Sequence, residues 1–224
     1  SADIADLNIR LIKKKQKWDL SDISEMARAA TQMVNDAIDA YVNDDENLAR
    51  KVISSDDKID ELFVKTKDKI IDEIAADKAN GEKAIDTLMV AKYFERIGDH
   101  AENVADAARQ RKEEGVSISK EAQKELGDML EMVNKIIRYA VEMFAKSDES
   151  HMQEIVTLED QVDEKERELQ KKHVERLTKG ECSPEAGMIF SDIVSGLERV
   201  ADHATNIAFA ITTEEDAEDG DIKR

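Results

Sequence analysis

Two stretches of this chain decide its fold: YFERIGDHAENVA at residues 93–105 and GLERVADHATNIA at residues 196–208. They align without a gap at an offset of 103 positions. The identical charged and polar pairs are Glu95 with Glu198, Arg96 with Arg199, Asp99 with Asp202, His100 with His203 and Asn103 with Asn206. The same offset relates SDDKID at residues 55–60 to LEDQVD at residues 158–163. Matches at one fixed offset over about sixty positions indicate two copies of one unit of about a hundred residues.

Each unit is predicted to be a bundle of three long helices. The chain has one proline, eight glycines and 4% aromatic residues, whereas strand-rich folds need aromatic and β-branched residues and frequent turns. Apolar residues at helical spacing predict helices at about 22–42, 45–77, 83–114, 119–145, 148–178 and 184–212. Short connections make neighbouring helices antiparallel. The predicted fold class is all-α: two tandem three-helix bundles, with six long antiparallel helices related by the internal repeat.

The repeat places the two helical units at residues 21–115 and 116–212. They are preceded by a basic lead-in at residues 1–20, which contains RLIKKKQK, and followed by an acidic tail at residues 213–224 that we expect to be disordered.

Composition excludes several classes of function. The 33 basic and 52 acidic residues give a net charge of −19, which would repel a nucleic-acid backbone, so we expect no nucleic-acid partner. No apolar run approaches the length of a membrane span, and no signal peptide opens the sequence. One cysteine, Cys182, fits a reducing compartment. We therefore expect a soluble, cytoplasmic chain.

The repeated acidic residues are spaced for cation binding. The third helix of each unit carries Glu-x-x-x-Asp-x-x-x-Asn, and the second carries Asp/Glu-x-x-x-Asp. Residues four apart share one helix face, about 6 Å apart at Cβ. If these faces oppose each other, four carboxylates converge and must take up protons or a cation. The candidate metal ligands are Asp56, Asp60, Glu95 and Asp99 in the first unit and Glu159, Asp163, Glu198 and Asp202 in the second.

Four neighbouring residues are candidates for additional ligands or for hydrogen bonds to the ligands. His100 and His203 lie about 100° round the helix from the preceding aspartate, and Asn103 and Asn206 continue the face of the motif. Oxygen ligands favour Mg²⁺, Mn²⁺ or iron, whereas imidazole would favour zinc. His151 and His173 stand alone on acidic helices, and we expect both at the surface.

Acidic pairs on an acidic helical protein are usually a solvated face, and this alternative stands beside the metal site. The repeat favours the metal site because the acids recur at equivalent positions while many neighbours change. The sequence contains no glycine-rich phosphate loop, no Gly-x-Ser-x-Gly elbow and no His-Glu-x-x-His helix. We therefore expect no enzymatic activity.

At ERIGDHAENVA and LERVADHATNIA the sequence resembles the PhoU family, from about Asp22 to Ala210. These proteins regulate bacterial phosphate uptake and consist of two similar three-helix bundles. The resemblance implies multinuclear metal clusters, typically of iron or zinc, on the eight carboxylates named above, and a non-enzymatic role in phosphate transport or phosphate signalling.

Two segments make the resemblance more specific. The stretch from His173 to Ala208 and EEGVSISKEAQKEL at residues 113–126 are similar to the PhoU-like cytosolic domain of bacterial sodium/phosphate cotransporters. The basic lead-in fits a position at the cytoplasmic face of a membrane. The expected partner is the membrane domain of a phosphate transporter or a phosphate-signalling protein, with inorganic phosphate as a ligand of bound metal. A homodimer, a carboxylate-bridged di-metal enzyme and a purely structural helical module remain open alternatives.

Overall fold

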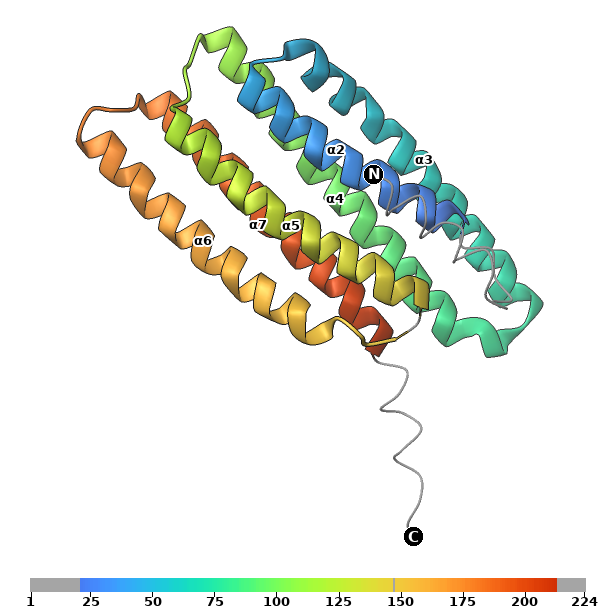
Figure 1. Ribbon diagram of the computed structural model, residues 1–224. Coiled ribbons are helices and arrows are strands. Elements are labelled where there is room, and N and C mark those ends of the chain that lie inside the picture. The colour runs from blue at the N-terminus through green and yellow to red at the C-terminus, as the bar shows by residue number, and fades with distance from the viewer. Residues whose placement is uncertain (1–20, 147, 213–224) are drawn as a thin grey trace.

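A computed structural model describes residues 21–146 and 148–212, and these residues form six long helices (Figure 1). The basic lead-in and the acidic tail lie outside the described residues. The helices are α2 (Ser21–Asn43), α3 (Glu46–Ala76), α4 (Gly81–Glu114), α5 (Lys120–Lys146), α6 (Met152–Thr178) and α7 (Pro184–Thr212), with a short 3-10 turn, η1 (Lys78–Asn80). The described part of the chain contains no strand, so the all-α prediction is confirmed.

Local signals in the sequence set most helix ends. Asp45 caps α3, because its side chain accepts a hydrogen bond from the backbone N–H of Leu48 at 3.0 Å. Ser183 caps α7 in the same way, with the N–H of Ala186 at 3.1 Å. Gly115 and Gly180 follow the ends of α4 and α6 with φ of 65° and 71°, a conformation that glycine adopts without strain.

One predicted break is shorter than expected. The sequence predicts a gap between the helices at about 45–77 and 83–114. Gly81 instead has helical dihedral angles, φ −59° and ψ −44°, and α4 begins at that residue, directly after η1.

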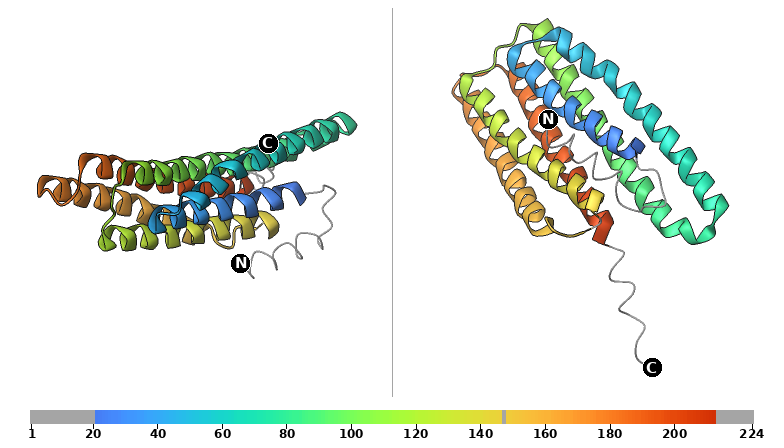
Figure 2. Two further views of the ribbon diagram at one scale, coloured as in Figure 1. Left: turned by 90° about the horizontal axis from the view of Figure 1, so that it is seen from above. Right: turned by 45° about the vertical axis from the view of Figure 1, so that its right-hand side comes forward.

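The six helices are arranged as two three-helix groups side by side. Helices α2, α3 and α4 pack against one another, as do α5, α6 and α7, and α4 also packs against α7. Consecutive long helices run in opposite directions, as do α4 and α7 at the junction between the groups (Figure 1). Viewed from above, the helices form an elongated, flattened body (Figure 2). None of the described helices is long and apolar enough to span a membrane.

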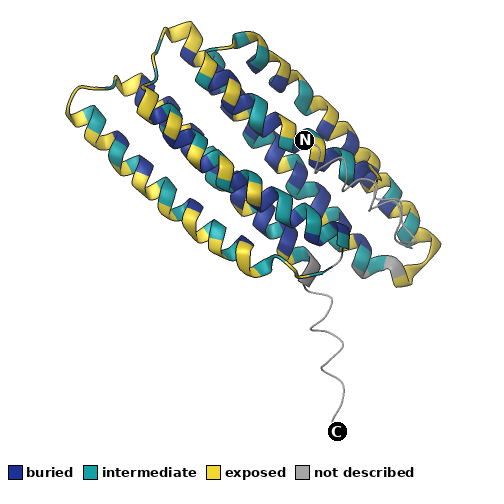
Figure 3. Cartoon of the chain, viewed as in Figure 1, coloured by how far each residue is buried: buried dark blue, intermediate teal, exposed yellow. Residues whose placement is uncertain are grey.

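A single hydrophobic core runs through both groups, with buried positions on the facing sides of the helices (Figure 3). Phe94 and Ile97 of α4 and Ile193 and Leu197 of α7 are all buried in it. A smaller cluster at one end of the α3–α4 hairpin joins Ile70 to Ala84.

The repeat also appears in a buried ion pair of each group. Asp22 of α2 is buried and pairs with Lys65, at 2.8 Å, and with Lys69 of α3. The equivalent Glu125 of α5 is buried and pairs with Lys172 at 3.2 Å and Arg176 at 2.9 Å of α6. In each group a buried acid near the start of the first helix is therefore tied to bases on the second.

His173 corrects one expectation. Its side chain is 5% exposed rather than at the surface, and its ring lies beside that of Phe190 on α7 at a centroid distance of 5.8 Å. Gly187 makes room for it, because a Cβ there would lie 2.3 Å from Nε2 of His173. His151 is half-buried, and its ring stacks on Tyr139 at 4.4 Å.

Candidate metal centres

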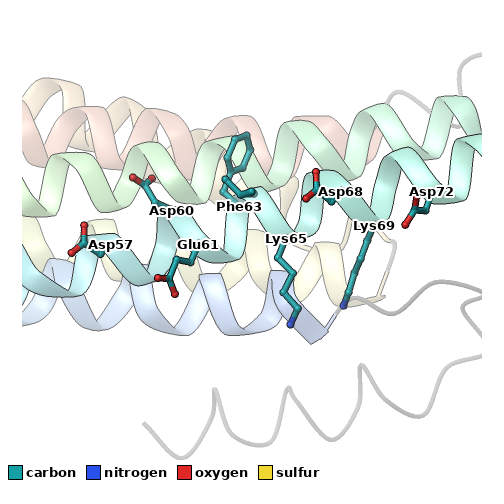
Figure 4. A pocket seen from close by; sticks show the side chains of 9 residues that line it. Asp57, Asp60, Glu61, Phe63, Lys65, Asp68, Lys69 and Asp72 are labelled. Atoms are coloured by element: carbon teal, nitrogen blue, oxygen red, sulfur yellow. The ribbon is translucent and has the colours of Figure 1, made fainter.

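The first predicted cluster lies where α4 passes close to α3. Gly98 permits this approach, since a Cβ there would lie 2.9 Å from Oδ1 of Asp56 and 2.9 Å from Cδ1 of Ile59. Asp56 of α3 is therefore held against the backbone of α4, between the motif residues Glu95 and Asp99. Asp60 follows one turn later and lies on the side of α3 opposite Lys65 and Lys69 (Figure 4).

The four predicted carboxylates of the first unit share one electrostatic environment. The pKa of Asp56 is raised to about 7, first by burial and then by its negative neighbours Glu102, Asp99, Asp60 and Glu95. Burial also raises the pKa of Asp99, with Glu95 and Asp60 adding to the shift. These groups repel one another in the charged state, which is the condition in which a cluster gains most from a cation.

One end of the first cluster already contains a positive charge. Nζ of Lys92 lies 2.5 Å from Oε1 of Glu95 and 5.2 Å from the centre of the Phe63 ring. The second oxygen of this carboxylate, Oε2 of Glu95, is buried and has no hydrogen-bond partner in the described residues. That orphaned oxygen is a free acceptor inside the cluster, and it fits an additional cation.

The second unit repeats the arrangement between α6 and α7. Burial raises the pKa of Glu159, and Asp163, Asp160 and Asp202 raise it further. Burial likewise raises the pKa of Glu198, with contributions from Glu166, Asp163 and Asp202. The four predicted residues of this unit therefore also lie within electrostatic reach of one another.

Two carboxylates near the clusters were missed by the sequence analysis. Glu102 lies one turn after Asp99, and its pKa is raised by burial and then by Asp99 and other neighbouring acids. Glu166 lies one turn after Asp163 and accepts a hydrogen bond from the Ser195 hydroxyl at 2.7 Å. Their i+3 spacing from predicted ligands was visible, but neither recurs at the offset of 103, where Thr205 and Phe63 stand.

His100 and His203 meet each other at the junction of α4 and α7. Their rings stack at a centroid distance of 5.3 Å, and Tyr93 stacks on His203 at 6.0 Å. Burial lowers the pKa of His100 to about 4, and the cationic neighbours Arg199 and Arg96 lower it further, as does His203. Burial lowers the pKa of His203 as well. Both imidazoles are therefore neutral near pH 7 and join the two units.

The asparagines of the motif differ in their contacts. Asn206 donates a hydrogen bond from Nδ2 to Oδ1 of Asp202 at 3.3 Å, as a residue that orients a ligand would do. Asn103 is exposed one turn beyond Asp99. Nδ1 of His203 is 3.9 Å from Oδ2 of Asp202 and has no hydrogen bond in the described residues.

The clusters are surface sites rather than core cavities. Asp60 and Asp202 are exposed, and the other six predicted ligands are half-buried. Among the described residues no three Asp, Glu, His or Cys side chains are arranged closely enough to enclose a metal ion. The carboxylate donor set, its raised pKa values and the orphaned oxygen of Glu95 nevertheless fit a hard cation held by oxygen ligands.

An open pocket that shares Asp60 with the first cluster runs along α3, and its nine lining residues include five acids (Figure 4). Its only ring is Phe63, which points to the same side of α3 as Asp60. The acidic character of α3 therefore extends beyond the cluster itself.

Comparisons with known proteins agree with the repeat. The family model described as the PhoU domain matches residues 23–108 and 126–211, two segments that begin and end 103 positions apart. The PhoU homolog 1 of Thermotoga maritima, a phosphate-specific transport system accessory protein, is 33% identical over 190 residues, covering 84% of this chain and 81% of that protein. The PhoU homolog of Rhizobium meliloti is 27% identical over 194 residues, with 84% and 80% covered.

Solved structures show the same fold. The crystal structure of PhoU from Pseudomonas aeruginosa superposes with a TM-score of 0.76 at 24% identity, covering 94% of this chain and 95% of that one. The phosphate transport system regulatory protein PhoU from Streptococcus pneumoniae gives 0.78 at 19% identity, with 96% of each chain covered. With both units matched by the domain model and a relative aligned over most of its length, the chain belongs to the PhoU family.

Proposed function

We propose that this PhoU-type regulator of phosphate transport binds metal ions, with one carboxylate cluster in each unit as the cation site. The observation that carries the proposal is the recurrence of a crowded carboxylate group at equivalent places in two units. Burial and mutual repulsion raise the pKa of Asp56, Glu159 and Glu198 in these groups. Crowding carboxylates in this way destabilises the folded chain, and the presence of such a group in both units is explained if the charges bind cations.

The central ligands would be Glu95 and Asp99 of α4 and Glu198 and Asp202 of α7. Asp56 and Asp60 would complete the first site, and Glu159 and Asp163 the second. Donors of this kind favour iron, Mn²⁺ or Mg²⁺, and zinc is the further candidate that the family implies. A bound metal would supply positive charge, and the carboxylates would hold it at the surface, within reach of an anionic ligand such as inorganic phosphate.

The test is the metal content of the purified protein, measured by elemental mass spectrometry without exposure to chelator. The variant combines Glu95→Gln, Asp99→Asn, Glu198→Gln and Asp202→Asn. A matched control makes the same number of amides at exposed acids outside the clusters: Asp68→Asn, Asp72→Asn, Glu121→Gln and Glu175→Gln. We expect more than one equivalent of metal in the wild type and the control, and its loss in the cluster variant.

A metal-free wild type, or equal metal in all three proteins, would contradict the proposal. The acidic stripe would then be a solvated face, and the family's regulatory role would depend on protein contacts alone. Circular dichroism of the cluster variant shows whether lost metal reflects lost ligands or an unfolded chain.

We propose further that the partner is a component of phosphate transport, either the membrane domain of a transporter or a phosphate-signalling protein at the cytoplasmic face of the membrane. The proposal is supported by the curated relatives, which are named as accessory proteins of the phosphate-specific transport system. Calorimetric titration with inorganic phosphate should give tighter binding to the metal-loaded protein than to the chelator-treated protein. Equal binding would contradict direct sensing of phosphate through metal.

A further inference from the structure

The two units differ in a coordinated way at two positions beside the clusters. The first unit has Phe63 on α3 and Lys92 on α4, and the equivalent positions of the second unit, 103 residues later, hold Glu166 and Ser195. An aromatic ring and an ammonium group in one unit are therefore replaced by a carboxylate and a hydroxyl in the other. In the first unit Lys92 contacts Phe63 and the motif residue Glu95, and in the second unit Ser195 contacts Glu166. The exchange therefore changes the charge at equivalent ends of the two clusters.

In the first unit the ammonium group occupies the end of the cluster. Nζ of Lys92 is 2.5 Å from Oε1 of Glu95, whose side chain is 13% exposed, and lies over the Phe63 ring at 5.2 Å. A ring face attracts a cation and offers no competing negative charge, so Phe63 favours this placement of the lysine. The lysine therefore acts on a carboxylate that a metal would need.

In the second unit the equivalent end has no such cation. The hydroxyl of Ser195 donates to Oε1 of Glu166 at 2.7 Å, and Gln170 bridges toward Ser195 at 3.4 Å. In the described ranges, 21–146 and 148–212, no lysine or arginine forms an ion pair with Glu159, Glu166 or Glu198. Asp163 pairs with Arg167 at 3.5 Å on the exposed side of the helix, and Arg199 lowers the pKa of Glu198 without forming an ion pair with it.

We propose that Lys92 is a built-in counter-ion that makes the two cation sites unequal, and that Glu166 is a further carboxylate of the stronger, second site. This inference rests on the proposed metal binding. Each cluster has one carboxylate beyond the four predicted ligands, Glu102 in the first and Glu166 in the second, so the difference between them is Lys92. A cation in the first cluster shares Glu95 with this ammonium group, whereas no lysine in the described part of the chain pairs with the equivalent Glu198. The second unit therefore binds a divalent cation first, and the first unit responds at higher cation concentration.

The experiment separates the sites by disabling one at a time in the full chain. Glu198→Gln with Asp202→Asn leaves only the first cluster, and Glu95→Gln with Asp99→Asn leaves only the second. Each background is stripped with chelator and titrated with Mn²⁺, and free Mn²⁺ is followed by electron paramagnetic resonance. We expect the second cluster to bind about tenfold more tightly, since removing one close ion-pair competitor has effects of this order.

Exchanging the distinguishing residue should exchange the affinities. Lys92→Ser, which installs the second unit's own residue, should tighten the first cluster about tenfold, and Ser195→Lys should weaken the second by a similar factor. Lys124→Ser is the matched control, because it removes the same charge from an exposed position of α5. Its effect measures the change in net charge alone and should be much smaller.

A second measurement needs no metal. In excess chelator at pH 8, Lys92→Ser should lower the urea midpoint of unfolding and Ser195→Lys should raise it, because one cluster loses a counter-ion and the other gains one. Lys92→Ser that behaves like Lys124→Ser in both measurements overturns the inference, and so do equal Mn²⁺ affinities of the two clusters. No Mn²⁺ binding by the wild type overturns the proposed function and, with it, the inequality of the sites.

Discussion

At the scale of single residues, the first and second units differ at two positions where their second and third helices touch, and the two differences compensate each other in volume. In the first unit Gly98 faces Ile59, and an added Cβ would lie 2.9 Å from Cδ1 of that isoleucine. The equivalent pair in the second unit is Ala201 and Val162, both buried. A methyl group has moved from one helix to the other, so the packed volume is nearly the same in the two units.

This compensation predicts the outcome of a double-mutant cycle. Gly98→Ala should destabilise the protein by about 1–3 kcal/mol, the usual cost of overpacking, in spite of the better helix propensity of alanine. Ile59→Val in the same chain should recover part of that loss, because it removes the Cδ1 that the new methyl meets. Urea unfolding of the four proteins gives the coupling energy.

Gly127→Ala is the control for the cycle, because nothing lies within 4 Å of a Cβ at that helical position. It should stabilise the chain by about 0.5–1 kcal/mol through backbone entropy alone. A Gly98→Ala cost that is unchanged by Ile59→Val would show that the strain comes from the Asp56 carboxylate instead.

The carboxylate of Asp56 provides the second prediction at this scale. Its pKa is raised to about 7, so in metal-free protein the folded state binds the proton more tightly than the unfolded state, in which the pKa is near 3.8. The stabilising effect of this proton is complete below about pH 4 and is lost as the pH rises to 7. Asp56→Asn should therefore raise the free energy of unfolding at pH 8 by about 1 kcal/mol, less than the shift alone implies because solvent screens the group.

The measurement is urea unfolding in chelator at pH 8 and pH 5, with Asp68→Asn as the control at an exposed acid of the same helix. The gain from Asp56→Asn should shrink at pH 5, where the wild type is already largely protonated at this position. A gain that does not depend on pH would contradict the origin in charge.

At the scale of helices, the α6–α7 hairpin is organised around His173. Its ring lies where a Cβ on Gly187 would be, 2.4 Å from Cε1, so only glycine leaves room on α7. Burial lowers the pKa of His173, and the nearby Arg176 lowers it further. The folded hairpin therefore holds the imidazole neutral.

Acid should weaken this hairpin. The pKa of His173 is below 6.5 in the folded state and near 6.5 when unfolded, so the unfolded state takes up the proton first and stability falls as the pH drops below 6.5. His173→Gln removes this proton but keeps a polar side chain, so the difference in unfolding free energy between wild type and variant should shrink from pH 7.5 to pH 5.5. A constant difference would show that the folded hairpin accepts the charged ring.

The elements show why sequence patterns succeed for some features and fail for others. Helix number and type are confirmed because apolar periodicity, Ser183 and Gly115 are local signals that act within one turn. The burial of His173 was predicted wrongly because the space for it is made by Gly187 on another helix, which no local pattern on α6 reveals. Glu102 and Glu166 were missed for a different reason: the repeat identified the candidate ligands, and these two residues break the repeat.

At the scale of the whole molecule, the two units are joined through α4 and α7. The stacked pair of His100 and His203 lies in this interface, and a Cβ on Gly196 of α7 would be 3.3 Å from Cγ2 of Val104 on α4. Equivalent residues that meet each other, on helices running in opposite directions, relate the units by an approximate two-fold axis. The sequence predicted two units but not their junction, because a helix buried on several sides has a weak amphipathic pattern.

One continuous core predicts that the two units unfold together. Leu126 of α5 is 0% exposed and belongs to the same buried cluster as Phe94 and Ile97 of α4. Leu126→Ala should cost about 2–5 kcal/mol, as expected for a cavity in a packed interior. Because α4 contributes to the cores of both units, its most protected amides should lose the same free energy of hydrogen exchange as those of α7, although the substitution lies in the second unit. Unchanged protection across α2, α3 and α4 would instead mean that the first unit stays folded when the second opens, and that the α4–α7 interface joins two separately stable bundles.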